Sequence, residues 1–204
     1  MEPGVFVRGL VVGLAVAAPV GPIGVLCIRR TLAYGRLAGL VTGLGAATVD
    51  AFYGGIAAFG VTVISGLLLS QQVWIRFIGG LFLCYLGVKT IAAAPAERAA
   101  VTAGPTPLRA YISAVALTLA NPPTILSFAA IFAGLGVGTT GRASPATILL
   151  VLGVLVGSAL WWVLLSSGVA LVRAKVSPRA LRWINCLSGT MLVGFGVVAF
   201  AGLR

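Results

Sequence analysis

Long runs of apolar residues, separated by short polar segments, recur along the whole chain. Each run has about 20 residues or more, the length that an α-helix needs to cross the hydrocarbon core of a bilayer. The runs cover residues 5–28, 37–64, 73–94, 111–133, 145–172 and 183–202. The pattern therefore predicts an all-α polytopic membrane protein with six transmembrane helices.

Prolines and glycines interrupt two of these runs. An interior proline removes a backbone donor and costs a helix about 3 kcal/mol relative to alanine. In lipid the freed carbonyl has no water to bind, so such a break is tolerated only beside protein or a water-filled cavity. The breaks contain Pro19, Gly21 and Pro22 in the first run and Asn121, Pro122 and Pro123 in the fourth. Simple packing kinks are the alternative, but four prolines at two corresponding places fit better with a binding site between two halves.

The two halves of the chain share one order of elements. Each begins with a broken run and continues with two runs that carry spaced glycines, which we interpret as packing faces. The matched pairs are Gly39 and Gly43 with Gly153 and Gly157, and Gly80 and Gly87 with Gly189 and Gly196. Because three is an odd number of crossings, the second half must be inverted relative to the first. We therefore predict two inverted three-helix repeats, residues 1–94 and 110–204, joined by a linker at 95–109 that is rich in Pro, Ala and Thr.

The basic residues predict the orientation of the helices. Ten of the 14 lie after the odd-numbered runs or, for Lys89, near the end of the third run, so the positive-inside rule places these loops and the linker in the cytoplasm and both termini outside. The ten are Arg29, Arg30, Arg36, Lys89, Arg98, Arg109, Arg173, Lys175, Arg179 and Arg182. A cleaved signal peptide is the alternative interpretation of the first run, with Arg8 before it and a small-residue motif at 15–17. The apolar run continues past that motif to Ile28, which argues against cleavage.

The composition excludes several classes of protein. The chain has 204 residues, of which 60% are hydrophobic and 8% charged, and its mean hydropathy of +1.14 is too high for a soluble domain. A net charge of +11 would suggest nucleic acid in a soluble protein, but here the basic residues lie between apolar runs, so we expect a lipid bilayer and no nucleic acid as partner. With no histidine and three acids, we expect no metal site, no cofactor and no enzyme. Cys27, Cys84 and Cys186 lie in three different runs without a C-x-x-C pair, so no disulfide framework is predicted.

Asp50 is the acid that lies inside an apolar run. A charge at the membrane centre costs at least about 2.5–3.5 kcal/mol, and intramembrane acids are functional by default. Along a helix that starts at Arg36, Asp50 would lie about 21 Å deep, past the middle of the membrane. One interpretation is a protonated side chain that only bonds a neighbouring helix. The other is a carboxylate that binds a substrate amino group, exchanges protons with the transport pathway, or does both.

The broken helices themselves suggest the chemistry of a substrate. The positive end of a half-helix favours a carboxylate, and unwound carbonyls favour an ammonium group, so together with Asp50 they suit a zwitterion. Asn121 can supply both a donor and an acceptor there. Tyr53 and Ser158 are further candidates in the same runs. Trp161 and Trp162 lie in the middle of the fifth run, where either packing or lining of the pocket is consistent with their position.

Five motifs in combination carry a family resemblance. They are Pro19-Val20-Gly21-Pro22, Gly45 through Asp50, Gly79-Gly80 through Gly87-Val88-Lys89, Asn121-Pro122, and Gly157-Ser158 with Trp161. Over nearly the whole chain they resemble the LysE/RhtB superfamily of small amino-acid exporters. The resemblance implies export of amino acids or related small solutes across the bacterial inner membrane, coupled to the proton-motive force. Two departures are an extra Val20 in the first motif and Pro123 where the family often has a lysine, so a specificity for lysine or arginine is not carried over.

We therefore predict a secondary transporter, an antiporter that exchanges protons for an amino acid or amine by alternating access between its two halves. A divalent-cation exporter of the same superfamily would need more acids, histidines or paired thiols in the runs. An intramembrane enzyme would need several convergent groups, and Asp50 stands nearly alone. A non-transport structural subunit is the remaining alternative. The sequence leaves open the substrate, the coupling ion and its stoichiometry, the direction of transport and any homo-oligomer.

Overall fold

The computed structural model describes most of the chain. It describes residues 3–19, 21–58, 71–92, 104–121, 124, 127–128, 145–173, 175 and 177–201. Within these ranges the elements of regular structure are seven α-helices, which confirms the predicted all-helical class. They are α1 (Pro3–Ala17), α2 (Pro22–Tyr34), α3 (Arg36–Ala58), α5 (Gln72–Ile91), α7 (Pro107–Leu119), α9 (Pro145–Arg173) and α10 (Pro178–Ala201).

The first predicted break separates α1 from α2, and the two helices meet at an angle of 79°. Gly21 caps α2 in an extended conformation, with φ −102° and ψ −165°. Pro22 is the first residue of α2, where its missing N–H forfeits no bond within the helix and its fixed φ suits a helix start. A residue that would disrupt a continuous helix thus begins a new one.

The end of α2 differs from the prediction. We expected the first run to end at Ile28 and the arginines after it to form a loop, and this boundary is wrong because α2 continues to Tyr34. The helix ends at Gly35, whose φ of 98° lies in the left-handed region that glycine adopts without strain. Its N–H donates to the carbonyl of Thr31 at 2.9 Å. Because α3 starts at the next residue, Arg29 and Arg30 lie on a helix that packs against α3.

Two helices of the described residues, α3 and α9, are long and apolar enough to cross a membrane, with mean hydropathies of 1.3 and 2.6. The bent pair formed by α1 and α2 supplies a third span if it is counted as one crossing. Shorter apolar helices cover 77–91 in α5 and Pro107–Leu119 in α7. The described residues therefore provide two or three candidate spans, and parts of the other predicted spans lie outside the described ranges.

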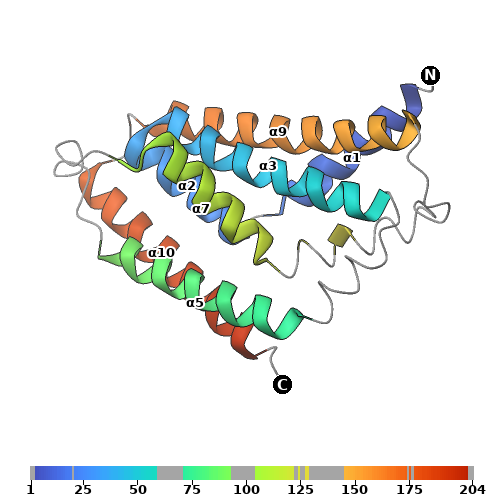
Figure 1. Cartoon of the computed structure of the whole chain (residues 1–204). Coiled ribbons are helices and arrows are strands. Elements are labelled where there is room, and N and C mark those ends of the chain that lie inside the picture. Colours follow the sequence, from blue (N-terminus) through green and yellow to red (C-terminus); the bar gives the residue numbers. More distant parts are fainter. Residues whose placement is uncertain are drawn as a thin grey trace.

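The helices pack in an arrangement that relates the two halves (Figure 1). α9 packs against α1 and α3, while α7 packs against α3. α5 and α10 pair with each other, and α10 also contacts α2. Figure 1 shows this pair on the side of α2 and α7 that faces away from α9. The first half's α1 thus contacts the second half's α9, as the second half's α7 contacts the first half's α3.

Glycines form the closest helix contacts. A Cβ added at Gly153 would clash with the backbone of α1 at Phe6, and one at Gly157 would clash with the carbonyl of Leu10. In the other pair, a Cβ at Gly87 would meet the carbonyl of Gly189 at 2.7 Å. These glycines let two helix backbones approach directly, which is how helices associate when lipid offers no hydrophobic driving force between them.

Three connections of the chain come together at one end of the bundle. The guanidinium group of Arg173, at the end of α9, donates to the carbonyls of Leu32 at 2.9 Å and Ala33 at 3.3 Å, beside the turn between α2 and α3. Gly104, within the predicted linker, lies so close to Tyr34 that a Cβ would meet its ring at 2.7 Å. Parts of the connections after the first, third and fifth predicted runs therefore lie at the same end.

Candidate functional site

Asp50 is buried in the middle of the bundle, with 3% of its surface exposed. Ser158 of α9 donates a hydrogen bond from its Oγ to Asp50 Oδ2 at 2.6 Å. The Nε1 of Trp162, one helical turn further along α9, donates to Ser158 Oγ at 3.2 Å. A short chain of hydrogen bonds therefore runs from the indole through the hydroxyl to the carboxyl group.

This chain of bonds holds Asp50 with neutral donors. A hydrogen bond to a charged group contributes about 1.5–3 kcal/mol, which offsets part of the penalty for burying a carboxylate. Within the described ranges the hydrogen-bond partner of Asp50 is Ser158 rather than a basic side chain. A carboxyl group in such surroundings can hold either a proton or the ammonium group of a ligand.

A cavity of about 50 Å³ opens beside Asp50 and joins the two predicted breaks. It is lined by Val16, Ala17, Pro19, Gly21, Pro22, Ile23, Gly24, Ala46, Asp50, Thr118, Asn121, Thr124 and Trp162. Since a water molecule takes about 30 Å³ in the liquid, the cavity has room for one or two waters. A whole amino acid would not fit without a movement of the surrounding helices.

The first break presents the N-terminus of α2 to this cavity. Pro22, Ile23 and Gly24 line it, and no side chain of the described residues caps the helix at Gly21. The first intrahelical bond of this turn runs from the N–H of Val25 to the carbonyl of Gly21 at 3.0 Å. The earlier N–H groups of a helix have no partner within it and carry a partial positive charge, so this wall favours anionic groups.

The second break presents the other end of a helix. Thr118, in the last turn of α7, and Asn121, just after it, both line the cavity. Asn121 Nδ2 donates to Thr124 Oγ1 at 2.8 Å, and the N–H of Thr124 donates to the carbonyl of Asn121 at 3.1 Å. The C-terminal end of a helix carries a partial negative charge. The cavity therefore has one wall suited to an anion, another suited to a cation, and an acid beside them.

The structure assigns a position to most of the residues expected from sequence. Pro19, Gly21, Pro22, Asn121 and Asp50 all line the cavity, and Ser158 bonds Asp50. Pro122 and Pro123 lie outside the described residues.

Two aromatic candidates lie near the cavity without lining it. Tyr53 is buried one turn after Asp50, and its hydroxyl donates to the carbonyl of Leu119 at 2.8 Å, which ties α3 to the end of α7. Trp161 is partly buried and packs against the core, while its neighbour Trp162 faces the cavity. The spacing could have revealed this, because Trp162 is one helical turn after Ser158 and shares its face.

Two threonines of the site were not predicted from the sequence. Thr118 and Thr124 line the cavity three residues before and after Asn121. The sequence did contain a signal for them, because each lies three residues from Asn121. Residues at this distance on either side of a break are expected to face the same cavity. Within the described ranges, no group of three acids, cysteines or histidines gathers that could hold a metal ion.

The fold and the site together define a class of protein. It is a helical membrane protein in which two helical breaks and a buried carboxyl group meet at one polar cavity. Comparison with known sequences identifies the family to which this chain belongs. The model of the LysE type translocator family matches residues 14–202, and the chain belongs to this family. The chain is therefore a member of a family of transporters and not of enzymes.

Individual relatives are distant but cover most of the chain. YcgF of Bacillus subtilis (strain 168), by its name a candidate amino acid efflux protein, is 25% identical over 197 residues, or 94% of this chain and 93% of that protein. The threonine efflux protein of Escherichia coli (strain K12) is 28% identical over 160 residues, covering 71% and 72% of the two chains. The uncharacterized membrane protein YahN of the same strain is 29% identical over 151 residues, covering 71% and 65%. No solved structure gives a significant match to this chain.

Proposed function

We propose that this protein exports a small amino acid or a related amine in exchange for protons. The observation that carries the proposal is the cavity in which both broken segments meet Asp50. One partly positive wall, one partly negative wall and an acid correspond to the carboxylate and ammonium ends of an amino acid. The names of the relatives, which include threonine efflux, point to the same substrate class.

In the proposed mechanism, Asp50 is the coupling residue. Its carboxyl group binds either the proton or the substrate's amino group, and Ser158 and Trp162 hold it toward the cavity. Asn121, Thr118 and the N-terminus of α2 then bind the remaining polar atoms of the substrate. Because the cavity has room for one or two waters only, the described conformation corresponds to a contracted site that must widen to load substrate.

The proposed movement uses two inverted repeats, residues 1–94 and 110–204, around the linker at 95–109. Two contacts support this internal repeat: α1 of the first half packs on α9 of the second, and α7 of the second half packs on α3 of the first. Inverted repeats with discontinuous first helices are a recurrent design of carriers, in which one half rocks against the other around a central site. The same symmetry supports six crossings.

We also propose that the protein lies in the bacterial inner membrane with both termini outside. The contacts of Arg173 with Leu32 and Ala33, and of Gly104 with Tyr34, bring the three odd-numbered connections to one end of the bundle. These connections carry most of the basic residues, which favours the cytoplasm for that end.

The decisive experiment measures efflux of preloaded, labelled amino acids from vesicles that contain the purified protein. Native protein is compared with Asp50→Asn, with and without a pH gradient, and with Thr48→Ala as control, since Thr48 is exposed on the same helix. We expect the pH gradient to drive efflux, and we expect Asp50→Asn to reduce it at least tenfold while Thr48→Ala does not. Unchanged efflux in Asp50→Asn would remove the proposed role of this residue. If no amino acid moves, the protein is not an amino-acid exporter, and divalent cations become the next substrate to test.

A further inference from the structure

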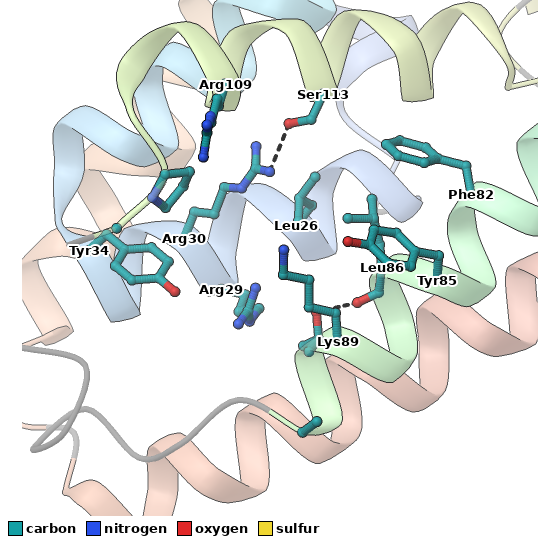
Figure 2. A pocket seen from close by; sticks show the side chains of 14 residues that line it. Leu26, Arg29, Arg30, Tyr34, Phe82, Tyr85, Leu86, Lys89, Arg109 and Ser113 are labelled. Carbon is teal, nitrogen blue, oxygen red and sulfur yellow. Dashed lines mark hydrogen bonds between the residues drawn. The ribbon is translucent and has the colours of Figure 1, made fainter. Parts of the chain in front are cut away.

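A second and larger cavity lies away from Asp50, between α2, the second half of α5 and the beginning of α7. Its volume is about 610 Å³, and four basic side chains line it: Arg29, Arg30, Lys89 and Arg109. Figure 2 shows the charged ends of Arg29, Arg30 and Lys89 around the same space, with Tyr34 and Tyr85 at its margins. The proposed transport mechanism assigns no role to this cavity.

Two of these arginines are buried among neutral groups. Arg30 is 6% exposed, and its Nη1 donates to Thr42 Oγ1 and to the carbonyl of Ala110, both at 3.0 Å. Its Nη2 donates to Ser113 Oγ at 2.8 Å. The Nε of Arg29, which is also buried, donates to Asn185 Oδ1 at 3.3 Å. These neutral acceptors fix both side chains but leave their positive charge uncompensated, although buried charges are usually paired.

The other two basic side chains, Lys89 and Arg109, are exposed. Lys89 lies at the end of α5, with its Nζ 5.7 Å from the ring centre of Tyr85, and Arg109 lies in the first turn of α7. No acid lines the cavity among the described residues, and the acid of the described chain, Asp50, lines the other one. Glu2 and Glu97 lie outside the described ranges. Two buried, hydrogen-bonded arginines and two exposed basic residues therefore surround a strongly positive cavity.

We propose that this basic cavity is a binding site for an oxyanion, either a carboxylate or a phosphate group. Arginine presents a planar set of donors that fits carboxylate and phosphate oxygens, and lysine adds a point charge. Two sources share this chemistry, a small soluble anion and the headgroup of an anionic lipid. The ligand supplies the negative charge that the surrounding helices do not.

The position of the cavity makes it a site separate from that of the transported substrate. Arg30 bonds Thr42, which precedes Asp50 by eight residues, or about 12 Å along α3. The basic cavity therefore lies toward the start of α3, at the end of the bundle where the odd-numbered connections meet. Binding there can be measured without transport, so its failure and the failure of the proposed export are distinguishable.

The test uses the full-length protein, purified in an uncharged detergent at constant ionic strength. Calorimetric titration with sodium phosphate measures the binding of a soluble anion. Native mass spectrometry compares the binding of phosphatidylglycerol, an anionic lipid, with that of phosphatidylcholine. The variants are Lys89→Gln and Arg109→Gln, whose side chains are exposed and whose loss should leave folding intact. Matched controls are Lys175→Gln and Arg182→Gln, which remove exposed charges outside the cavity and correct for the general attraction of a basic protein.

We expect Lys89→Gln and Arg109→Gln each to weaken binding about five- to tenfold, the effect of losing one charged contact at a partly exposed site. Arg30→Gln should weaken it further, provided that its melting curve shows a folded protein. Weakening of phosphate binding identifies a soluble anion as ligand, and weakening of phosphatidylglycerol binding alone identifies a lipid headgroup. The proposal is wrong if the native protein binds neither probe, or if the control variants weaken binding as much as the cavity variants.

Discussion

Ser158 on α9 donates its hydroxyl proton to Asp50 on α3 over 2.6 Å, which joins residues that are 108 positions apart in the chain. α3 belongs to the first half of the chain and α9 to the second, and the two helices pack against each other. Asp50, the proposed coupling residue, is thus bonded by a helix from the other half of the chain. Movement of the halves against each other would change the surroundings of Asp50 directly.

Substitution Ser158→Ala tests this bond. The change removes the donor to Asp50 and the acceptor for Trp162, and we expect transport to fall about tenfold, consistent with a buried bond of about 1–3 kcal/mol. The control is Ser167→Ala, on the same helix, because among the described residues the Ser167 hydroxyl bonds the carbonyl of Val163 in its own helix. Equal transport in the two variants would show that the bond does not contribute to function.

Tyr53→Phe should destabilise the protein by about 1 kcal/mol, since it removes a partly buried hydrogen bond between the Tyr53 hydroxyl and the carbonyl of Leu119. Tyr111→Phe is the matched control, because its hydroxyl bonds Thr48 at the exposed surface, and there we expect a change within about 0.5 kcal/mol. Thermal unfolding of both variants in the same detergent measures the difference. A larger loss in Tyr111→Phe would contradict the assignment of Tyr53 as the link between α3 and α7.

Gly157→Ala should destabilise the contact between α1 and α9. The added methyl group would overlap the backbone of Leu10, and overpacking of this kind costs about 1–3 kcal/mol. Gly168→Ala, further along the same helix, has open space around it, so we expect no loss and a gain of up to about 1 kcal/mol in helix propensity. Melting temperatures that fall equally in both variants would exclude the contact as the cause.

Labelling of single cysteines tests the proposed orientation. In a background without the three natural cysteines, Lys175→Cys should react with an impermeant reagent only from the cytoplasmic side. Gln71→Cys, before α5, should react from the opposite side. The inverse pattern would reverse the orientation, and labelling of both positions from one side would contradict an odd number of crossings between them.

The site could be predicted from sequence where a residue conflicts with its surroundings. Pro19, Pro22 and Asp50 are unfavourable in a plain membrane helix, so their presence in apolar runs is enough to indicate a break and a polar centre. Thr118 is not unfavourable in a helix, and only the fold shows that it lines the cavity. The wrong boundary after Ile28 had a similar cause, because charge was interpreted as a loop signal although arginine is a good helix former.

The basic cavity was beyond sequence reasoning for a different reason. Arg29, Arg30, Lys89 and Arg109 come from three helices and were interpreted singly as loop charges under the positive-inside rule. Their convergence depends on how α5 and α7 pack beside α2, which is a property of tertiary structure. Nothing in the local pattern of any one helix indicates it.

Both cavities share α2 as a wall, with Pro22, Ile23 and Gly24 at one and Leu26, Arg29 and Arg30 at the other. The helix has 13 residues and a length of about 20 Å, and it is joined to α3 by one residue. A helix of this length moves as one rigid body, so its two ends cannot be displaced independently. Any tilt that makes room for substrate at Pro22 also moves Arg29 and Arg30. An anion bound to these arginines would therefore oppose the tilt and lower the rate of transport.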